Sequence, residues 1–521
     1  MNATMSKRGF LQAVGAAAGV GAVYRSMEAL GLAGTGAAHA ATPKLPRGSG
    51  EGRSVAILGA GIAGMAAALE LSKAGYRCTI LEASGRAGGR NLTARAGDAI
   101  DEVDSRQRVR FGDEDHLYAN LGPARIPHHH TTMLGYCKEF GVELEVFTND
   151  NRAALFHNLE RFGGRPVTAR RAITDTRGYI AELLAKAVDA GSLDSALTAE
   201  DKERILQMLV QYGDLGEDRL YKGTKRGGYR GKRVNAGLEA GDFDDPLDFG
   251  ELLQADFWRY KLHYDDFLDQ NPTLLQPVGG MDAIAKAFEK RVSGRIRYGS
   301  VVEEIRKTPA GVRIVHRPAA GGAAAALDAD FAICTIPAPV LKDIANDFAP
   351  DTRAAIASVA FVPAVKIAFQ ARRRFWEEDH AIYGGITWTD QDITQIWYPP
   401  YGYHRNRGVV MGAYIWDREP ALRFEGMSPA ERLSVAIAEG ERIHPGYASE
   451  VASGVSRAWG KVPFHKGAWP ATRGAPEALR RPDGAIYFAG DQASALPGWQ
   501  EGAALAAHAA VAAINERVLA K

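Results

Sequence analysis

The sequence predicts a mixed α/β fold in which parallel and antiparallel sheets occupy separate domains. Residues 54–90 have the pattern of a strand, a glycine-rich turn, a helix and a second strand. Residues 166–260 have a helical, charged pattern, and residues 365–417 alternate between strands and turns. A chain of 521 residues is too long for a single core, so roughly two to three domains are expected.

The first forty residues have the pattern of an export signal. S-K-R-x-F-L at residues 6–11 precedes a weakly apolar run, and A-H-A at residues 38–40 is a cleavage signal. The apolar run is too short to span a bilayer. The order of residues resembles the twin-arginine signal with lysine in place of the first arginine. Export to the periplasm or the medium is therefore expected; an ordinary secretory signal and a disordered tail are the alternatives.

The first predicted strand leads into a phosphate-binding turn. Residues 54–58 are a short apolar run typical of a buried parallel strand, and the G-x-G-x-x-G turn after it contains Gly59, Gly61 and Gly64. The glycines permit a tight turn, close approach to a pyrophosphate and helix-on-strand packing, in that order. A second strand ends at Glu82, whose carboxylate can accept hydrogen bonds from ribose hydroxyls. This context indicates dinucleotide binding.

A second glycine turn favours a flavin over a nicotinamide. Residues 86–90, R-A-G-G-R, follow the ribose acid directly, and a permanently bound flavin needs its pyrophosphate held on both sides. Near the other end of the sequence, residues 485–491 read as a strand ending in Gly-Asp. G-W-Q-E-G at residues 498–502 follows and leads into an alanine-rich helix.

With these two signatures the chain resembles the flavin amine oxidases, and the resemblance covers nearly everything after residue 53. It implies a Rossmann-like FAD-binding domain, an antiparallel-sheet substrate domain and a helical insertion domain. The implied segments are residues 54–115, 270–340 and 456–521 for FAD binding, 116–165 and 341–455 for the substrate domain, and 166–265 for the helical domain.

The resemblance also implies how FAD is held. The implied contacts are Gly59, Gly61, Ile62, Ala63, Gly64, Glu82, Ala83, Arg86, Gly89, Arg90, Gly122, Pro123, Ala124, Arg125, Val302, Gly490, Asp491, Gly498 and Trp499. No cysteine lies beside Asp491, where some relatives tether the flavin, so FAD is expected to be bound non-covalently.

The segment G-P-A-R-I-P, residues 122–127, resembles that of the L-amino-acid oxidases, in which the arginine binds the substrate carboxylate. The planar guanidinium of Arg125 suits this task because it can donate two parallel hydrogen bonds. The alternative is a surface or phosphate-facing arginine. Tyr398, in I-W-Y-P, resembles a tyrosine that gives the same carboxylate a second donor, and a half-buried strand residue is the alternative.

Aromatic and cationic residues complete the predicted active site. By resemblance, Trp499 lines the substrate side of the flavin, the Gly498 carbonyl accepts from the substrate amine, and Trp459 forms a second wall. Lys366 stands in an otherwise apolar strand, where a buried ammonium needs a partner. The family's lysine holds a water against flavin N5, so Lys366 is the predicted catalytic residue; a lysine on the solvent face of an edge strand is the alternative.

Two groups of histidines are candidate functional residues. His263 falls near a base proposed in some L-amino-acid oxidases, but its surroundings match poorly, and a surface histidine is an equal alternative. The run at residues 128–130, H-H-H, starts a helix, and three adjacent residues cannot all face one ion. We therefore expect this run to cap the helix and to face solvent, with no metal bound.

Composition excludes several other classes of protein. The net charge of +1 gives no electrostatic surface for nucleic acid or acidic membranes. The three cysteines have neither paired nor metal-ligand spacing. The expected partners are an L-amino acid, dioxygen and a second copy of the chain in a homodimer.

The sequence thus predicts an FAD-dependent L-amino-acid oxidase that releases a 2-oxo acid, ammonia and hydrogen peroxide. Oxidation of an amine without a carboxylate, or an amino-acid 2-monooxygenase reaction, is the alternative within flavin chemistry. A flavoprotein that binds FAD without turnover is the alternative from another class.

Overall fold

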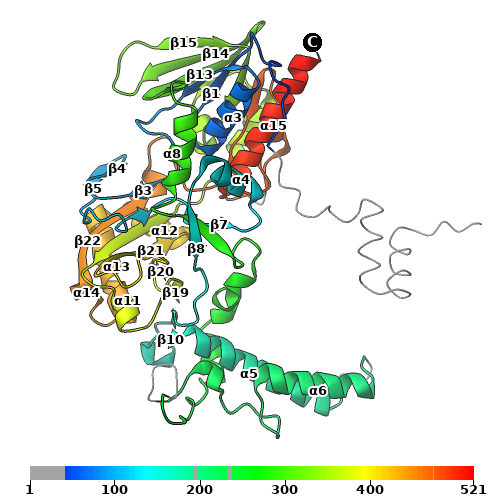
Figure 1. Ribbon diagram of the computed structural model, residues 1–521, viewed down its shortest axis with the longest axis vertical. Coiled ribbons are helices and arrows are strands. Elements are labelled where there is room, and N and C mark those ends of the chain that lie inside the picture. Colours follow the sequence, from blue (N-terminus) through cyan, green and yellow to red (C-terminus); the bar gives the residue numbers. More distant parts are fainter. Residues whose placement is uncertain (1–41, 193–195, 231–236, 473, 521) are drawn as a thin grey trace, which may run out of the picture.

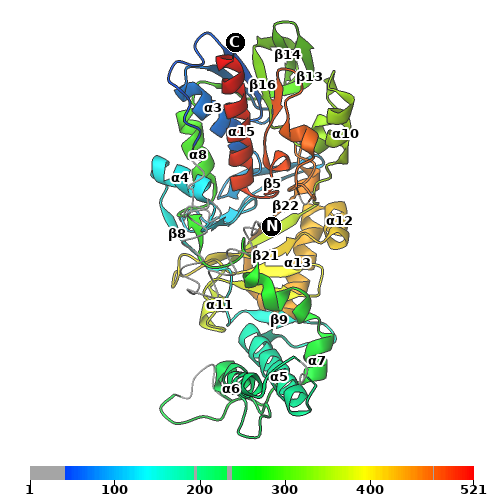
Figure 2. The same ribbon diagram turned by 90° about the vertical axis from the view of Figure 1, so that its right-hand side faces the viewer.

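The computed structural model describes residues 42–192, 196–230, 237–472 and 474–520. The predicted export signal, residues 1–40, lies outside these ranges. The molecule is elongated, with a parallel sheet at one end, a mixed sheet in the middle and a helical hairpin at the other end (Figures 1 and 2). No helix in the described part of the chain combines the length and the hydropathy that a bilayer crossing requires.

The parallel sheet has five strands in the order β12-β2-β1-β16-β23. In that order their bounds are Ile296–Arg297, Arg77–Leu81, Ser54–Leu58, Phe331–Cys334 and Ile486–Phe488. β1 pairs in parallel with β2 on one side and with β16 on the other, as expected for a doubly wound sheet. The sheet therefore joins stretches of chain that are far apart in the sequence.

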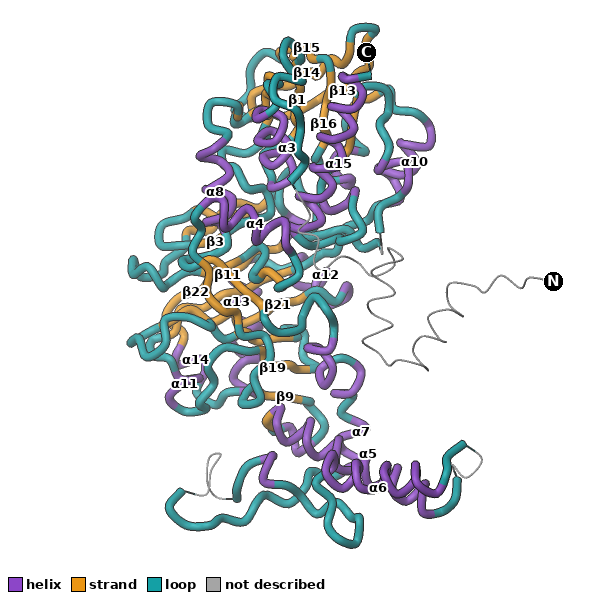
Figure 3. Tube along the Cα trace, turned by 45° about the vertical axis from the view of Figure 1, so that its right-hand side comes forward, coloured by secondary structure: helices purple, strands orange, loops and turns teal. Residues whose placement is uncertain are grey.

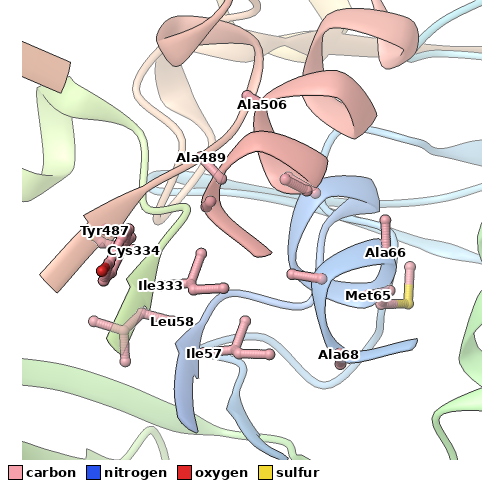
Figure 4. Packing of buried hydrophobic residues seen from close by; sticks show 14 of the residues in the cluster. Ile57, Leu58, Met65, Ala66, Ala68, Ile333, Cys334, Tyr487, Ala489 and Ala506 are labelled. Carbon is pink, nitrogen blue, oxygen red and sulfur yellow. The ribbon is translucent and has the colours of Figure 1, made fainter. Parts of the chain in front are cut away.

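Two alanine-rich helices cover this sheet, α3 (Ile62–Lys73) and α15 (Gln500–Leu519), and they pack against each other (Figure 1). Met65 on α3 and Ala506 on α15 are buried against Ile57 and Ile333 of the strands (Figure 4). Small side chains allow the helix backbones to come close to the sheet.

Smaller sheets and helices surround the parallel sheet. A four-stranded sheet, β15-β14-β13-β17, lies beside it (Figure 1). Its strands are β13 (Ser300–Thr308), β14 (Gly311–Pro318), β15 (Ala325–Ala329) and β17 (Ala345–Asn346). The helices here are α8 (Asp282–Arg291), α9 (Ala338–Leu341) and α10 (Pro350–Ser358). The two-stranded pairs β3 (Thr93–Ala94) with β6 (Ala119–Asn120) and β4 (Ala99–Glu102) with β5 (Ser105–Arg108) lie against the mixed sheet instead.

The mixed sheet has seven strands in the order β10-β9-β19-β20-β21-β18-β22. Their bounds are Val167–Thr168, Leu155–His157, Ile386–Thr389, Gln395–Trp397, Gly408–Ile415, Val365–Ala371 and Val451–Ala458. β18 is antiparallel to both β21 and β22, and every residue of β18 is buried. The nearby helices are α11 (Phe375–Glu378), α12 (Arg418–Gly426), α13 (Pro429–Ile443) and α14 (Tyr447–Glu450).

A three-stranded sheet connects the two large sheets, with order β7-β11-β8. Its strands are β7 (Ile126–Pro127), β8 (Leu144–Phe147) and β11 (Leu274–Pro277). Between β7 and β8 lies α4 (Thr131–Phe140), which ends at Gly141 in the left-handed conformation, as expected for a helix C-terminus.

The predicted helical segment forms a hairpin of α5 (Ala169–Asp189) and α6 (Ala199–Gly213) that projects from the body (Figure 3). Thr198 and Asp201 form a reciprocal capping box at the start of α6. The chain returns through α7 (Phe249–Gln254) and the short 3-10 helices Phe257–Arg259 and Lys261–Asp266.

The packing of α3 on β1 leads to a prediction about Gly64. A Cβ there would lie 2.0 Å from the Gly59 carbonyl oxygen, so Gly64→Ala should lower the midpoint of thermal unfolding in calorimetry. Gly135 is the matched control, because it lies on α4 with nothing within 4 Å of its added Cβ. Gly135→Ala should stabilise the protein by about 0.5–1 kcal/mol. Equal midpoints for the two variants would contradict this view of the turn.

Candidate active site

A cavity of about 380 Å³ lies at the carboxyl ends of the parallel strands, where ligands bind in open α/β sheets. Its walls come from the loops after β1, β2 and β16, from the start of β13 and from the N-terminus of α15. Most of the predicted FAD contacts line this cavity. They are Gly59, Gly61, Ile62, Ala63, Glu82, Ala83, Gly89, Arg90, Gly122, Pro123, Val302, Gly490, Asp491, Gly498 and Trp499.

The first glycine turn fits a phosphate. Gly59 has φ +109°, and a Cβ there would lie 2.6 Å from Thr335 Oγ1. Gly61 caps α3 without a side-chain hydrogen bond, and no acidic residue stands in the first turn of that helix. A Cβ on Gly61 would have no atom within 4 Å, so its surface is open for close approach. A helix N-terminus whose N–H groups have neither a side-chain cap nor an acidic neighbour is a position that binds anions.

Glu82 and Arg86 act differently although both belong to the predicted signature. Glu82 lines the cavity and accepts hydrogen bonds from the Ala60 N–H at 2.7 Å and from Ser84. Arg86 is not among the cavity-lining residues; it donates to the carbonyls of Ala87, Gly89 and Asn91. The structure does not bring the Arg86 guanidinium to the cavity, because it is bonded to the carbonyls of the glycine turn.

The two signatures meet in an ion pair. Arg90 Nη1 and Nη2 lie 2.9 and 2.5 Å from the two carboxylate oxygens of Asp491, which is almost completely buried. Asp491 also accepts from the Gly498 N–H at 3.1 Å. One carboxylate thus fixes the Gly-Arg loop and the loop before Trp499. Gly64 packs α3 on β1, in line with its predicted packing role, but it does not line the cavity where it was also expected as an FAD contact.

A second cavity of about 260 Å³ adjoins the first and shares Lys366, Tyr414, Gly498 and Trp499 with it. Its walls are largely aromatic, and they contain basic residues but no carboxylate. The lining residues are Gly122, Pro123, Ala124, Arg125, Ile126, His130, Met133, Tyr260, Tyr264, Gln270, Lys366, Trp397, Tyr414, Trp416, Trp469, Gly498, Trp499 and Gln500.

Arg125 lies in this second cavity, with its guanidinium 5.0 Å from the centre of the Trp397 ring and 5.7 Å from that of Trp499. It makes no ion pair with any described residue. Its Nε donates to Gln270 Oε1 at 3.0 Å, its Nη2 donates to the same oxygen, and Nη2 also donates to the Tyr264 hydroxyl at 2.8 Å. Gln270 Oε1 therefore occupies the edge of Arg125 at which carboxylates bind.

Sequence reasoning missed Gln270, Tyr264 and Tyr260. All three belong to the segment that follows α7, and no motif marks them. His263, in the same segment, is exposed and lies 3.4 Å from Asp266, outside both cavities. This agrees with a surface histidine.

Lys366 is buried on β18 and lines both cavities. Its Nζ donates to the carbonyls of Asn120 at 3.1 Å and Gly122 at 2.6 Å, and lies 4.5 Å from the centre of the Tyr414 ring. Burial, and secondarily the charge of Arg125, lower its pKa to about 7. The edge-strand alternative is excluded because β18 is paired on both sides.

The structure does not bring Tyr398 to the second cavity, which contains Arg125. Its hydroxyl is buried on the far side of the sheet with Thr387 Oγ1 at 2.8 Å and His444 Nε2 at 2.6 Å. The neighbouring Trp397 faces Arg125 instead, because consecutive strand residues point to opposite faces. The prediction that the Tyr398 hydroxyl reaches the substrate carboxylate is therefore wrong, because this hydroxyl is bonded to Thr387 and His444.

Trp459 and His130 complete the walls. Trp459, predicted as a second wall of the substrate site, lines the first cavity and not the second, and its Nε1 donates to the Leu121 carbonyl at 2.9 Å. His130 is buried and lies edge-on to Trp499, with ring centres 5.0 Å apart. The expectation of a solvent-facing histidine run therefore holds for His128, which is exposed, and is wrong for His130.

Glu501 caps α4, the helix that begins directly after His130. It stands in the first turn of α15, and its carboxylate accepts from the N–H groups of Thr132 at 3.0 Å and Met133 at 2.8 Å. Glu501 therefore caps α4 in place of the expected histidine side chain. In this way α15 fixes the loop that contains Arg125.

Fold and site together define a flavoprotein with a substrate cavity beside its cofactor cavity. Residues 62–515 match the family described as flavin containing amine oxidoreductase. The chain belongs to this family and its cofactor is FAD, whose phosphates the glycine turns and the start of α3 fit.

Relatives of known type agree with this assignment. The chain is 29% identical over 525 residues to the flavin-dependent L-tryptophan oxidase RebO of Lentzea aerocolonigenes, covering 89% of this chain and 98% of that protein. It is 27% identical to the putative L-amino-acid oxidase YobN of Bacillus subtilis (strain 168), covering 87% and 92%. Among solved structures, cyclohexylamine oxidase from Brevibacterium oxydans IH-35A is similar in fold, with a TM-score of 0.57, 18% identity and coverage of 90% and 100%.

The burial of Lys366 predicts how stability depends on pH. Because its pKa is about 7 in the folded protein and about 10.4 when unfolded, the unfolded state binds more protons between these values. The unfolding free energy of the native protein should therefore rise with pH in this window, by about 1.4 kcal/mol per pH unit from this group. The unfolding free energy of Lys366→Met relative to the native protein should therefore be highest below pH 7 and should fall as pH rises through this window, because only the native protein gains stability there.

Denaturant unfolding of both proteins at several pH values measures this difference. A difference that stays constant from pH 6 to pH 10 would mean that Lys366 titrates equally in both states.

Proposed function

We propose that the protein catalyses FAD-dependent oxidative deamination of L-amino acids, forming a 2-oxo acid, ammonia and hydrogen peroxide. The observation that carries the proposal is Arg125, a cation without an acidic partner among the described residues, held by aromatic rings next to the cofactor cavity. A cation in such surroundings favours an anionic ligand. Relatives named L-amino-acid oxidases support a carboxylate.

Substrate binding is proposed to replace the two hydrogen bonds that Arg125 donates to Gln270. The substrate carboxylate takes the edge that Gln270 Oε1 now occupies, while Tyr264 keeps its hydrogen bond to Nη2. With the carboxylate fixed there, the amine is placed near the Gly498 carbonyl, and the Cα–H bond faces the cofactor cavity. Fixing these groups before reaction lowers the entropic part of the barrier. FAD, when bound, accepts the hydride from Cα.

Lys366 is proposed to act in the reaction with dioxygen. It lies at the boundary of both cavities and holds the carbonyls of Asn120 and Gly122. An ammonium in this low-dielectric position stabilises negative charge that develops on dioxygen. A pKa of about 7 allows the charged form to be present near neutral pH.

Arg125→Ala tests the role of the carboxylate. We expect kcat/KM for amino acids to fall by about a hundredfold or more, because each hydrogen bond to a charged group contributes about 1.5–3 kcal/mol. Turnover of the corresponding decarboxylated amine should fall much less. A peroxide assay with both substrates measures this. Equal losses would mean that Arg125 supports the fold or the flavin and does not bind the carboxylate.

Gln270→Glu tests the same carboxylate position by changing the residue that now occupies it. Its carboxylate should pair with Arg125 and compete with the substrate, so KM for amino acids should rise while KM for the amine stays the same. An unchanged KM for amino acids would place the substrate carboxylate elsewhere.

Lys366→Met should slow reoxidation of the reduced enzyme by dioxygen more than anaerobic reduction by substrate, because methionine keeps the length of the side chain without its charge. Rapid-mixing absorbance at the flavin band separates the two half-reactions, and anaerobic reduction is the internal control. If oxidation is unchanged and reduction is slow, Lys366 acts on the amino acid instead.

Export and assembly belong to the same proposal. The signal pattern at residues 1–40 supports export, by the twin-arginine route, of a chain that has already bound FAD. A homodimer is supported by exposed apolar side chains on the helical hairpin: Ile180 and Leu183 on α5, and Met208 and Tyr212 on α6.

A further inference from the structure

Three side chains from two distant segments converge beside the substrate cavity. His129 Nε2 lies 3.0 Å and His130 Nε2 3.3 Å from Asp269 Oδ1. One ligand atom from each residue lies within 4.8 Å of the others. Imidazole nitrogen and carboxylate oxygen are both common zinc ligands, and three protein ligands leave a fourth position for water.

We propose that His129, His130 and Asp269 form a binding site for a divalent transition-metal ion of the zinc type. The H-H-H run alone predicts no metal site, because three adjacent residues cannot all face one ion. The structure brings two of them together with a carboxylate from another segment, and His128 remains exposed. The metal would replace the protons that the two Nε2 atoms share with Asp269.

The site is both fixed and open. His130 stands just before α4, whose first N–H groups are held by Glu501, so the ring position is set by the fold. The side chains of His129 and Asp269 are 28% and 33% exposed, which gives an ion a path from solvent. A site built in this way does not depend on substrate or on turnover.

Metal binding at this site would affect the substrate cavity, because two of its ligands lie next to residues of that cavity. His130 lies edge-on to Trp499, and Asp269 immediately precedes Gln270, which holds Arg125. A metal that fixes Asp269 would also hold Gln270 on Arg125, in the place of the substrate carboxylate. This consequence rests on the proposed function, whereas metal binding itself does not.

Equilibrium dialysis of the untagged holoenzyme against Zn²⁺ near neutral pH tests the site. We expect one ion per chain that a chelator removes. His129→Gln and Asp269→Asn should bind it at least tenfold more weakly. His128→Gln is the matched control, because it removes an adjacent imidazole that is not part of the cluster, and its binding should equal that of the native protein. Flavin absorbance and thermal midpoints of each variant verify that it is folded.

A kinetic measurement gives a second readout. Zn²⁺ should raise the KM for the amino acid several-fold in the native protein and in His128→Gln, with no such effect in Asp269→Asn. The proposal is overturned if His129→Gln and Asp269→Asn bind Zn²⁺ within twofold of the native protein, or if His128→Gln loses binding equally. A protein that binds Zn²⁺ as expected but does not oxidise amino acids would contradict the proposed function alone.

Discussion

The bidentate ion pair between Arg90 and Asp491 is the contact on which both cavities depend. A buried carboxylate needs compensation, and Asp491 obtains it from Arg90 and from the Gly498 N–H. The pair therefore fixes the Gly-Arg loop of one signature against the Gly-Asp turn of the other. Removing Arg90 would leave the buried Asp491 carboxylate without its cation, and removing Asp491 would release the loop that contains Trp499.

A second buried carboxylate, that of Glu501, fixes the position of the loop that contains Arg125. Glu501 lies in the first turn of α15 and holds the start of α4 by two backbone N–H groups. The short stretch from Asp491 to Glu501 thus positions the cofactor loop, the Trp499 wall and the loop before α4 that contains Arg125. Both acids are almost completely buried, so their geometry is set by packing as well as by charge.

Sequence patterns predicted the contiguous parts of this arrangement well. The strands, the glycine turns and the Gly-Asp motif depend on local backbone geometry, and β1 has the expected bounds. The substrate cavity depends on which face of a strand each side chain takes and on segments without a motif. Tyr398 and Trp397 differ by one position, so a motif match alone could not separate them. Gln270, Tyr264 and Glu501 act through tertiary contacts that no local pattern contains.

The topology of the parallel sheet has a consequence for folding. β1 pairs with β16, and the Ser54 and Asp330 side chains beside them are hydrogen-bonded across 276 residues. The mixed sheet and the helical hairpin come from the chain between or after these strands. Parallel pairing over such separations is slow, because loop closure precedes the gain from the contacts. Until it is complete, apolar strands such as β1 and β16 have open edges, so refolding from denaturant competes with aggregation and favours dilute, chaperone-assisted conditions.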